Sequence, residues 1–128
     1  HHKTVRRQRQ MCIRDSTGPA PFYKELGKKF GPIDLGFGNL GAYNFYPLVP
    51  VKDKSTAHAN PEELLSLMKD LEVKKVIGMH WGTAILSLEP IWEPPVRFKE
   101  NAEKFGYKKD EAIIFKIGEI KKLKDLIN

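Results

Sequence analysis

The feature that most limits the fold of this chain is a capped helix followed directly by an apolar strand, between Asn60 and Trp81. Asn60 is a good N-cap, and Pro61 suits the first position of a helix. An apolar stripe then continues to Leu71 at helical spacing. The run from Val73 to Trp81 has the pattern of a strand whose side chains point alternately to two faces. Helices that alternate with strands predict a layered α/β domain.

Similar signals flank this unit. We expect helices over Pro21–Phe30 and Val96–Phe105, strands over Ile33–Leu40 and Ala112–Ile120, and a basic helical turn over Lys121–Asn128. In the first helix Phe22, Leu26 and Phe30 are four residues apart, so we expect them to face inward. Asp34 lies in an apolar strand, where a buried carboxylate needs a hydrogen-bonding partner. Roughly three strands and three helices would leave one sheet face uncovered, which indicates part of a larger fold.

Composition narrows the class of protein. The chain has 128 residues, of which 41% are hydrophobic and 30% charged, as in a soluble one-domain protein. No apolar run approaches the ~20 residues of a membrane-spanning helix. The single cysteine, Cys12, excludes an intrachain disulfide and is compatible with the reducing cytoplasm.

The net charge of +6 comes mostly from the start of the chain. Of the 22 basic and 16 acidic residues, five basic and one acidic lie in residues 1–16. No aromatic residue lies among those basic residues, so we expect a solvated, non-homologous tail and no nucleic-acid partner. The segment Met11–Ser16 has the character of translated junction sequence. We therefore expect a tail over 1–16 and one domain over 17–128.

Two histidines are candidates for chemistry. His80 ends the apolar strand and opens into a loop that begins Trp81-Gly82, which suits a side chain that projects into a cleft. His58 lies just before a helix N-terminus, where anions are favoured and an imidazole could donate to a phosphate. From these patterns alone, a structural histidine and an exposed loop histidine remain open alternatives. Two histidines 22 residues apart do not make a zinc site, which needs three or four ligands.

Several segments in order resemble one family. They are Thr17-Gly18, Glu25–Leu35, Leu40–Tyr43, His58–Glu63, Gly78–Thr83 and Glu93–Pro95. Their order and spacing resemble the C-terminal half of metallo-β-lactamase-fold hydrolases. The nearest groups are the N-acylphosphatidylethanolamine-hydrolysing phospholipases D and the ascorbate-phosphate-lactonase-like proteins. The resemblance covers residues 17 to about 106 and implies the C-terminal half of an αββα sandwich.

The resemblance also implies a chemistry. In that family two zinc ions lie at the edge of the sandwich, and the histidine of the His-Trp-Gly-Thr segment binds one of them. This position corresponds to His80, whereas His58 corresponds to a histidine near the substrate phosphate, and Tyr43 would line the cleft. The implied reaction is hydrolysis of a phosphodiester or lactone bond by zinc-bound hydroxide. The implied substrate is a small molecule or a phospholipid, and the implied location is cytoplasmic, including the surface of a membrane. A homodimer of the intact protein is compatible with this assignment.

The chain also departs from the family pattern. The family has a metal-bridging aspartate directly before Thr-Gly, where this chain has Ser16, and Asp15 is displaced by one position. The loop between Tyr43 and His58 is longer than in the phospholipase group, which leaves the substrate open. The His-x-His-x-Asp-His motif, which supplies most of the zinc ligands, is absent. We therefore expect this chain alone to be inactive. A non-catalytic module of the same fold remains an alternative, as does a nucleic-acid binder that uses the basic tail.

Overall fold

The computed structural model describes residues 12–13, 21–48 and 58–127. The predicted tail over 1–16 therefore lies outside the described residues except for Cys12 and Ile13. Part of the long loop predicted between Tyr43 and His58 lies outside them as well.

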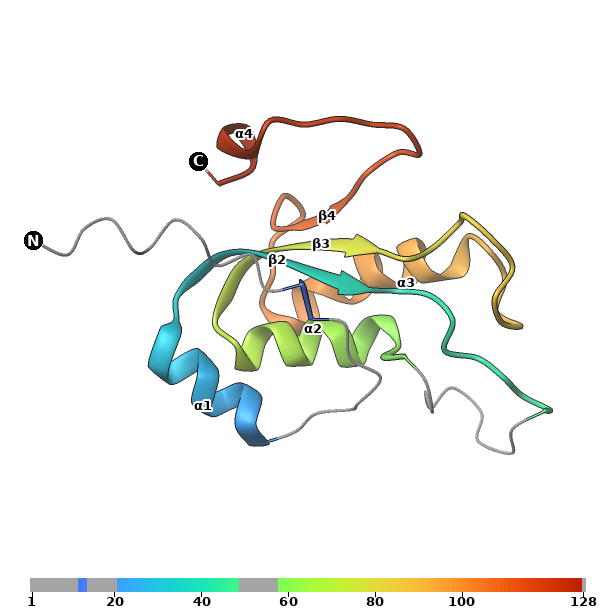
Figure 1. Cartoon of the computed structure of the whole chain (residues 1–128), viewed down its shortest axis with the longest axis horizontal. Coiled ribbons are helices and arrows are strands. Elements are labelled where there is room, and N and C mark those ends of the chain that lie inside the picture. Colours follow the sequence, from blue (N-terminus) through green and yellow to red (C-terminus); the bar gives the residue numbers. More distant parts are fainter. Residues whose placement is uncertain (1–11, 14–20, 49–57, 128) are drawn as a thin grey trace, which may run out of the picture.

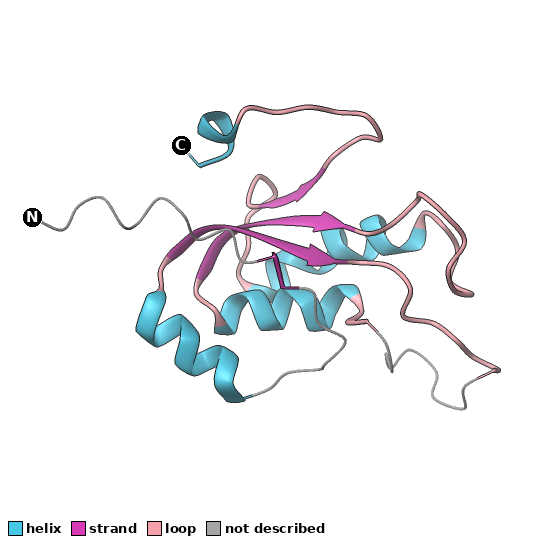
Figure 2. Ribbon diagram, viewed as in Figure 1, coloured by secondary structure: helices cyan, strands magenta, loops and turns pink. Residues whose placement is uncertain are grey.

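The described residues form a four-stranded parallel sheet with the order β1-β2-β3-β4. The strands are β1 (Cys12–Ile13), β2 (Ile33–Asn39), β3 (Val73–Met79) and β4 (Ala112–Ile114). One face of the sheet carries α1 (Pro21–Phe30), α2 (Pro61–Asp70), and α3 (Glu93–Asn101) with its 3₁₀ continuation η2 (Ala102–Phe105). The short helix α4 (Leu123–Ile127) lies over the opposite face (Figures 1 and 2). The predicted α/β class is confirmed.

Helix α2 begins where the sequence predicts. The Asn60 side chain accepts a hydrogen bond from the Glu63 backbone N–H at 2.8 Å, and the Glu63 carboxylate accepts one from the Asn60 N–H at 3.0 Å. This reciprocal pair is a capping box, which satisfies donors that the first turn of a helix leaves open. All of the predicted stripe is buried beneath the sheet: Leu64, Leu65, Leu67, Met68 and Leu71.

Two glycines in β2 let helix α2 lie close to the sheet. A Cβ on Gly36 would lie 2.8 Å from the Met68 sulfur, and one on Gly38 would collide with the Leu64 side chain. Because only glycine leaves room for these side chains, the two glycines mark a close approach of the helix to the strand.

The inward face of α1 differs from the prediction. Phe22 and Phe30 are 46% and 36% exposed. Tyr23 is only 2% exposed and belongs to the helix-side core, the buried cluster between the sheet and helices α1, α2 and α3. Gly27 lies on the same face as Tyr23 and meets the backbone at the end of α2. The close contact at Gly27 sets the rotation of α1, so Tyr23 is the residue that packs inward.

Three other boundaries and environments need correction. Helix α3 begins at Glu93 rather than Val96, because its two prolines occupy the first turn, where no backbone N–H is needed. Strand β4 ends at Ile114 rather than Ile120, since its pairing with β3 ends at Gly78. The Asp34 side chain is 57% exposed and pairs with Lys74 at 2.7 Å, so it is not a buried carboxylate.

The face of the sheet opposite α2 is covered only in part. Leu35, Ile77 and Leu126 form a small buried cluster there, with Phe37, Ile113 and Phe115 packed against it. Leu126 comes from α4, which is therefore the element that contacts this face. The prediction of a sheet with one poorly covered face agrees with this arrangement.

Candidate functional site

The candidate site lies at the carboxyl ends of β2 and β3. Asn39 and Met79 are paired in register as the last residues of these strands. The Leu40 N–H then donates to the Met79 carbonyl at 2.8 Å and extends the pairing by one residue. The loops that follow both strands therefore start side by side, which is the usual position of a binding site in a parallel sheet.

His80 leaves the sheet in an unusual backbone conformation. The sequence analysis included it in a strand that ends at Trp81, but β3 ends at Met79 and His80 has a φ of 61°. This left-handed region is uncommon for residues other than glycine. Such conformations occur often at functional sites. The turn leaves the His80 side chain exposed at the end of the sheet.

His58 reaches the same place from the chain that precedes α2. Its ring centroid lies 4.9 Å from that of His80, with 55° between the ring planes. The Asn39 side-chain amide lies 3.4 Å from His58 Nδ1. The fold thus brings together two histidines that are 22 residues apart, and it adds the nearly buried amide of Asn39.

Two histidines alone do not fit a zinc ion. Zinc in proteins is held by three or four side chains of histidine, cysteine, aspartate or glutamate. Within residues 12–13, 21–48 and 58–127, no group of three or more such side chains is placed to hold a metal ion. The described residues therefore supply at most part of a metal centre.

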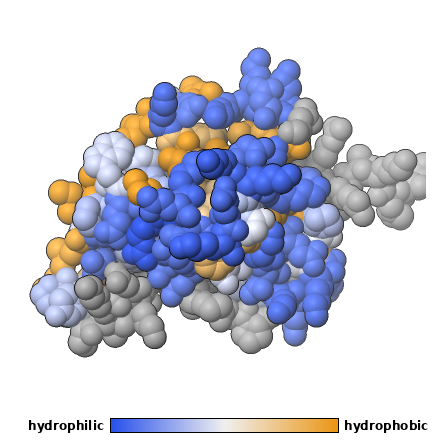
Figure 3. All heavy atoms as spheres, turned by 180° about the vertical axis from the view of Figure 1, so that it is seen from behind, coloured by the Kyte–Doolittle hydropathy of each residue, from blue (hydrophilic) through white to orange (hydrophobic). Residues whose placement is uncertain are grey.

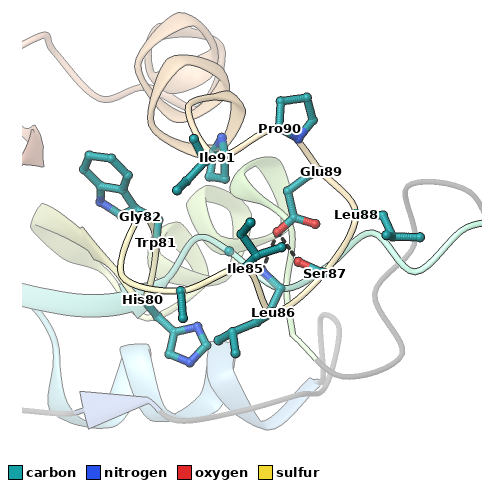
Figure 4. Close-up of a pocket in the computed structure, with 14 residues that line it drawn as sticks. His80, Trp81, Gly82, Ile85, Leu86, Ser87, Leu88, Glu89, Pro90 and Ile91 are labelled. Carbon is teal, nitrogen blue, oxygen red and sulfur yellow. Dashed lines mark hydrogen bonds between the residues drawn. The ribbon is translucent and has the colours of Figure 1, made fainter.

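A hollow of about 420 Å³ opens beside His80. Figure 4 shows the His80 ring at one end of it, next to Ile85 and Leu86. The hollow is lined mainly by the loop after β3 together with Gly41, Ala42 and Pro94. The wall is mostly apolar, and such hollows with a few polar groups are the usual form of small-molecule sites.

Glu89 links the loop after β3 to the loop after β2 through hydrogen bonds. Its carboxylate accepts hydrogen bonds from the Ala42 N–H at 2.6 Å, the Asn44 N–H at 3.0 Å and the Ser87 hydroxyl at 2.6 Å. Burial tends to raise the pKa of Glu89, but the bonds from Ser87 and the backbone outweigh it and leave the pKa below its ordinary value. The one carboxylate in the loop is thus turned inward as an anion (Figure 4).

Tyr43 has a supporting position. Its side chain is fully buried, and its hydroxyl donates to Glu93 Oε1 at 2.7 Å. Burial raises the pKa of Tyr43, and the bond to Glu93 raises it further, so the phenol stays protonated. The family resemblance predicts that Tyr43 lines the cleft. In the described structure the hollow is lined at this point by its neighbours Gly41 and Ala42.

Sequence reasoning missed three residues of this region: Asn39, Glu89 and Arg97. Asn39 is a polar residue at the end of an apolar strand, and that position was a usable signal. Glu89 and Arg97 gave none for the bonds that join separate elements, because those partners lie 35 to 54 residues away along the chain.

Known proteins resemble this chain in sequence. It is 49% identical over 51 residues to "N-acyl-phosphatidylethanolamine-hydrolyzing phospholipase D, mitochondrial" of Saccharomyces cerevisiae, a match over 40% of this chain and 11% of that protein. It is 34% identical over 79 residues to "N-acyl-phosphatidylethanolamine-hydrolyzing phospholipase D 1" of Caenorhabditis elegans, over 61% of this chain and 21% of that protein. The matched segments thus span about a tenth to a fifth of these relatives' length. No family model matches the chain.

A solved structure shares the fold. Igni18, described as a novel metallo hydrolase from the hyperthermophilic archaeon Ignicoccus hospitalis, superposes with a TM-score of 0.53 at 19% identity. The match covers 79% of this chain and 35% of that one. Because the identity is low, the match shows only that the two chains share a fold. The family resemblance predicted from the sequence is confirmed. The chain has the α/β fold of the metallo-β-lactamase type and is related in sequence to the N-acyl-phosphatidylethanolamine-hydrolysing phospholipases D.

Proposed function

We propose that this chain is part of a metal-dependent hydrolase that cleaves a phosphodiester bond. The observation that carries the proposal is the meeting of His58 and His80 at the carboxyl ends of β2 and β3. Two neighbouring imidazoles, of which that of His80 lines an apolar hollow, suit a reaction that needs nitrogen ligands or proton donors next to a substrate. The names of the two phospholipase relatives supply the reaction class.

The two histidines have different proposed roles. His80 is exposed and turned out of the strand, so we assign it as one ligand of a metal ion, zinc in the first instance. His58 is half-buried, and we assign it as a proton donor or hydrogen-bond donor toward a phosphoryl oxygen. A zinc ion would supply an activated water and charge stabilisation when bound in a complete site. The remaining ligands would come from outside the described residues.

The surface around the hollow favours a lipid substrate. Large apolar side chains of the loop after β3 are exposed: Ile85, Leu86, Leu88, Ile91 and Trp92. Figure 3 shows apolar side chains at the edge of the molecule from which these loops project in Figure 1. Glu89, the one charged residue between Ile85 and Trp92, is turned inward. Within the described ranges, no helix is both long and apolar enough to cross a membrane. We therefore propose peripheral contact of a cytoplasmic protein with a lipid surface.

The test is hydrolysis by the product of the complete reading frame that contains residues 17–128. It is assayed with zinc against bis(p-nitrophenyl) phosphate, an N-acylphosphatidylethanolamine in mixed vesicles, and a sugar-phosphate lactone. We expect the vesicle lipid to be cleaved fastest, and His80→Ala to lower kcat/KM by about 100-fold or more. Lys74→Ala, at the other end of β3, is the matched control and should leave kcat/KM unchanged.

One observation favours a second candidate, a non-catalytic module of the same fold. It is the lack of a third metal-binding side chain beside the two histidines among the described residues. A complete gene product that is folded, binds no metal and cleaves none of the three substrates would favour this module and contradict the hydrolase.

A further inference from the structure

Arg97 on α3 is the centre of a hydrogen-bonded cluster with Tyr43, Glu62 and Glu93. Its Nε and Nη2 donate to the two carboxylate oxygens of Glu62 at 3.1 and 2.8 Å. Its Nη1 donates to Glu93 Oε1 at 3.0 Å and lies 3.4 Å from the Tyr43 hydroxyl. The guanidinium also lies 5.2 Å from the centre of the Tyr43 ring. All three nitrogens of one guanidinium are thus engaged.

This cluster is shielded from water in part. The side chains of Arg97, Glu62 and Glu93 are 24%, 29% and 32% exposed, and Tyr43 is fully buried. Asn101 adds a further bond to Glu62 at 2.9 Å. A bidentate arginine–carboxylate pair in such surroundings fixes the relative orientation of the two side chains. A lysine ammonium acts as a point charge and cannot reproduce this orientation.

Glu62 and Tyr43 connect Arg97 to segments that carry or contact the histidines. Glu62 lies in the first turn of α2, four residues after His58. Tyr43 lies in the loop that follows Asn39, the last residue of β2, whose amide contacts His58. In the same loop Gly41 packs so closely on the His80 carbonyl that a Cβ there would collide with it. Arg97 therefore holds the segment before α2 and the loop after β2 against one helix.

We propose that Arg97 is a positioning residue that fixes the spacing and orientation of the His58 and His80 rings. It acts on the rings through Glu62 on one side and through Tyr43 and Glu93 on the other. Its importance for hydrolysis rests on the proposed function, but the geometric claim does not.

The test uses the 128-residue chain and needs neither metal nor substrate. Proton and ¹⁵N spectra of the histidine imidazoles report the ring environments, and a nuclear Overhauser effect between the His58 and His80 rings reports their spacing. We expect Arg97→Met to lose this effect and to shift both sets of imidazole resonances. We expect Arg97→Lys to recover the native spectrum only in part.

Lys99→Met is the matched control for a merely structural role. Lys99 lies on the same helix, but its Nζ donates to the carbonyls of Lys109 and Ala112, away from the histidines. We expect Lys99→Met to lower the melting temperature and to leave the imidazole spectra unchanged.

Glu62→Gln provides a milder change if Arg97→Met does not fold. It keeps the shape of Glu62 but removes its charge, and it should shift the His58 resonances. The proposal is overturned if either folded variant, Arg97→Met or Glu62→Gln, keeps native imidazole spectra and the native ring contact. It is equally overturned if Lys99→Met disturbs the imidazoles as much as Arg97→Met does. Neither result bears on whether the parent protein is a hydrolase.

Discussion

Phe98→Ala is expected to lower the free energy of unfolding by about 3–5 kcal/mol, the usual cost of removing a buried aromatic ring. Phe98 lies on the inner face of α3 and is fully buried in the helix-side core. Chemical denaturation of the 128-residue chain, followed by circular dichroism, measures the loss.

Phe22→Ala is the matched control for this measurement. Phe22 is 46% exposed on α1, so its removal should cost about 1 kcal/mol or less. If Phe22→Ala and Phe98→Ala lowered the free energy of unfolding equally, the rotation of α1 described above would be wrong. Phe22 would then pack inward.

Gly27→Ala is the second large effect, and two physical contributions oppose each other. Alanine is favoured over glycine inside a helix by about 1 kcal/mol, so propensity alone predicts stabilisation. A Cβ on Gly27, however, would collide with the Asp70 carbonyl oxygen and approach the Leu71 backbone. Overpacking costs about 1–3 kcal/mol, and backbone atoms cannot turn aside as a side chain can. We therefore expect a net loss of stability.

The same denaturation experiment measures the sign of this change. Ser66→Ala on α2 is a suitable comparison, because Ser66 is only half-buried and lies inside the helix. A Gly27→Ala variant that is more stable than the unchanged chain would show that α1 does not pack on α2 through this glycine.

Local signals predicted most of the fold. The cap at Asn60 and the apolar stripe of α2 each act within a few residues, so the sequence displays them directly. The face of α1 was predicted wrongly because helical spacing fits both Phe22 and Tyr23. The contact of Gly27 with α2, which is a tertiary contact, decides between them.

The site was less accessible to sequence reasoning. His58 and His80 were identified through motifs, but their 4.9 Å separation follows from the pairing of β2 with β3 and the placement of α2. The left-handed backbone conformation at His80 could not be predicted, because the residue at this position is not a glycine. Arg97 and Glu62 are 35 residues apart, and such long-range ion pairs leave no pattern in a single sequence.

The zinc content of the purified 128-residue chain tests the central claim most directly. We propose that His80 belongs to a metal centre that the described residues do not complete. After dialysis against a zinc-containing buffer and removal of free metal, elemental analysis should give well under two zinc ions per chain. Any zinc that remains should decrease in His80→Ala, because one ligand is lost. Two stoichiometric zinc ions, retained equally by the His80→Ala variant, would contradict the account.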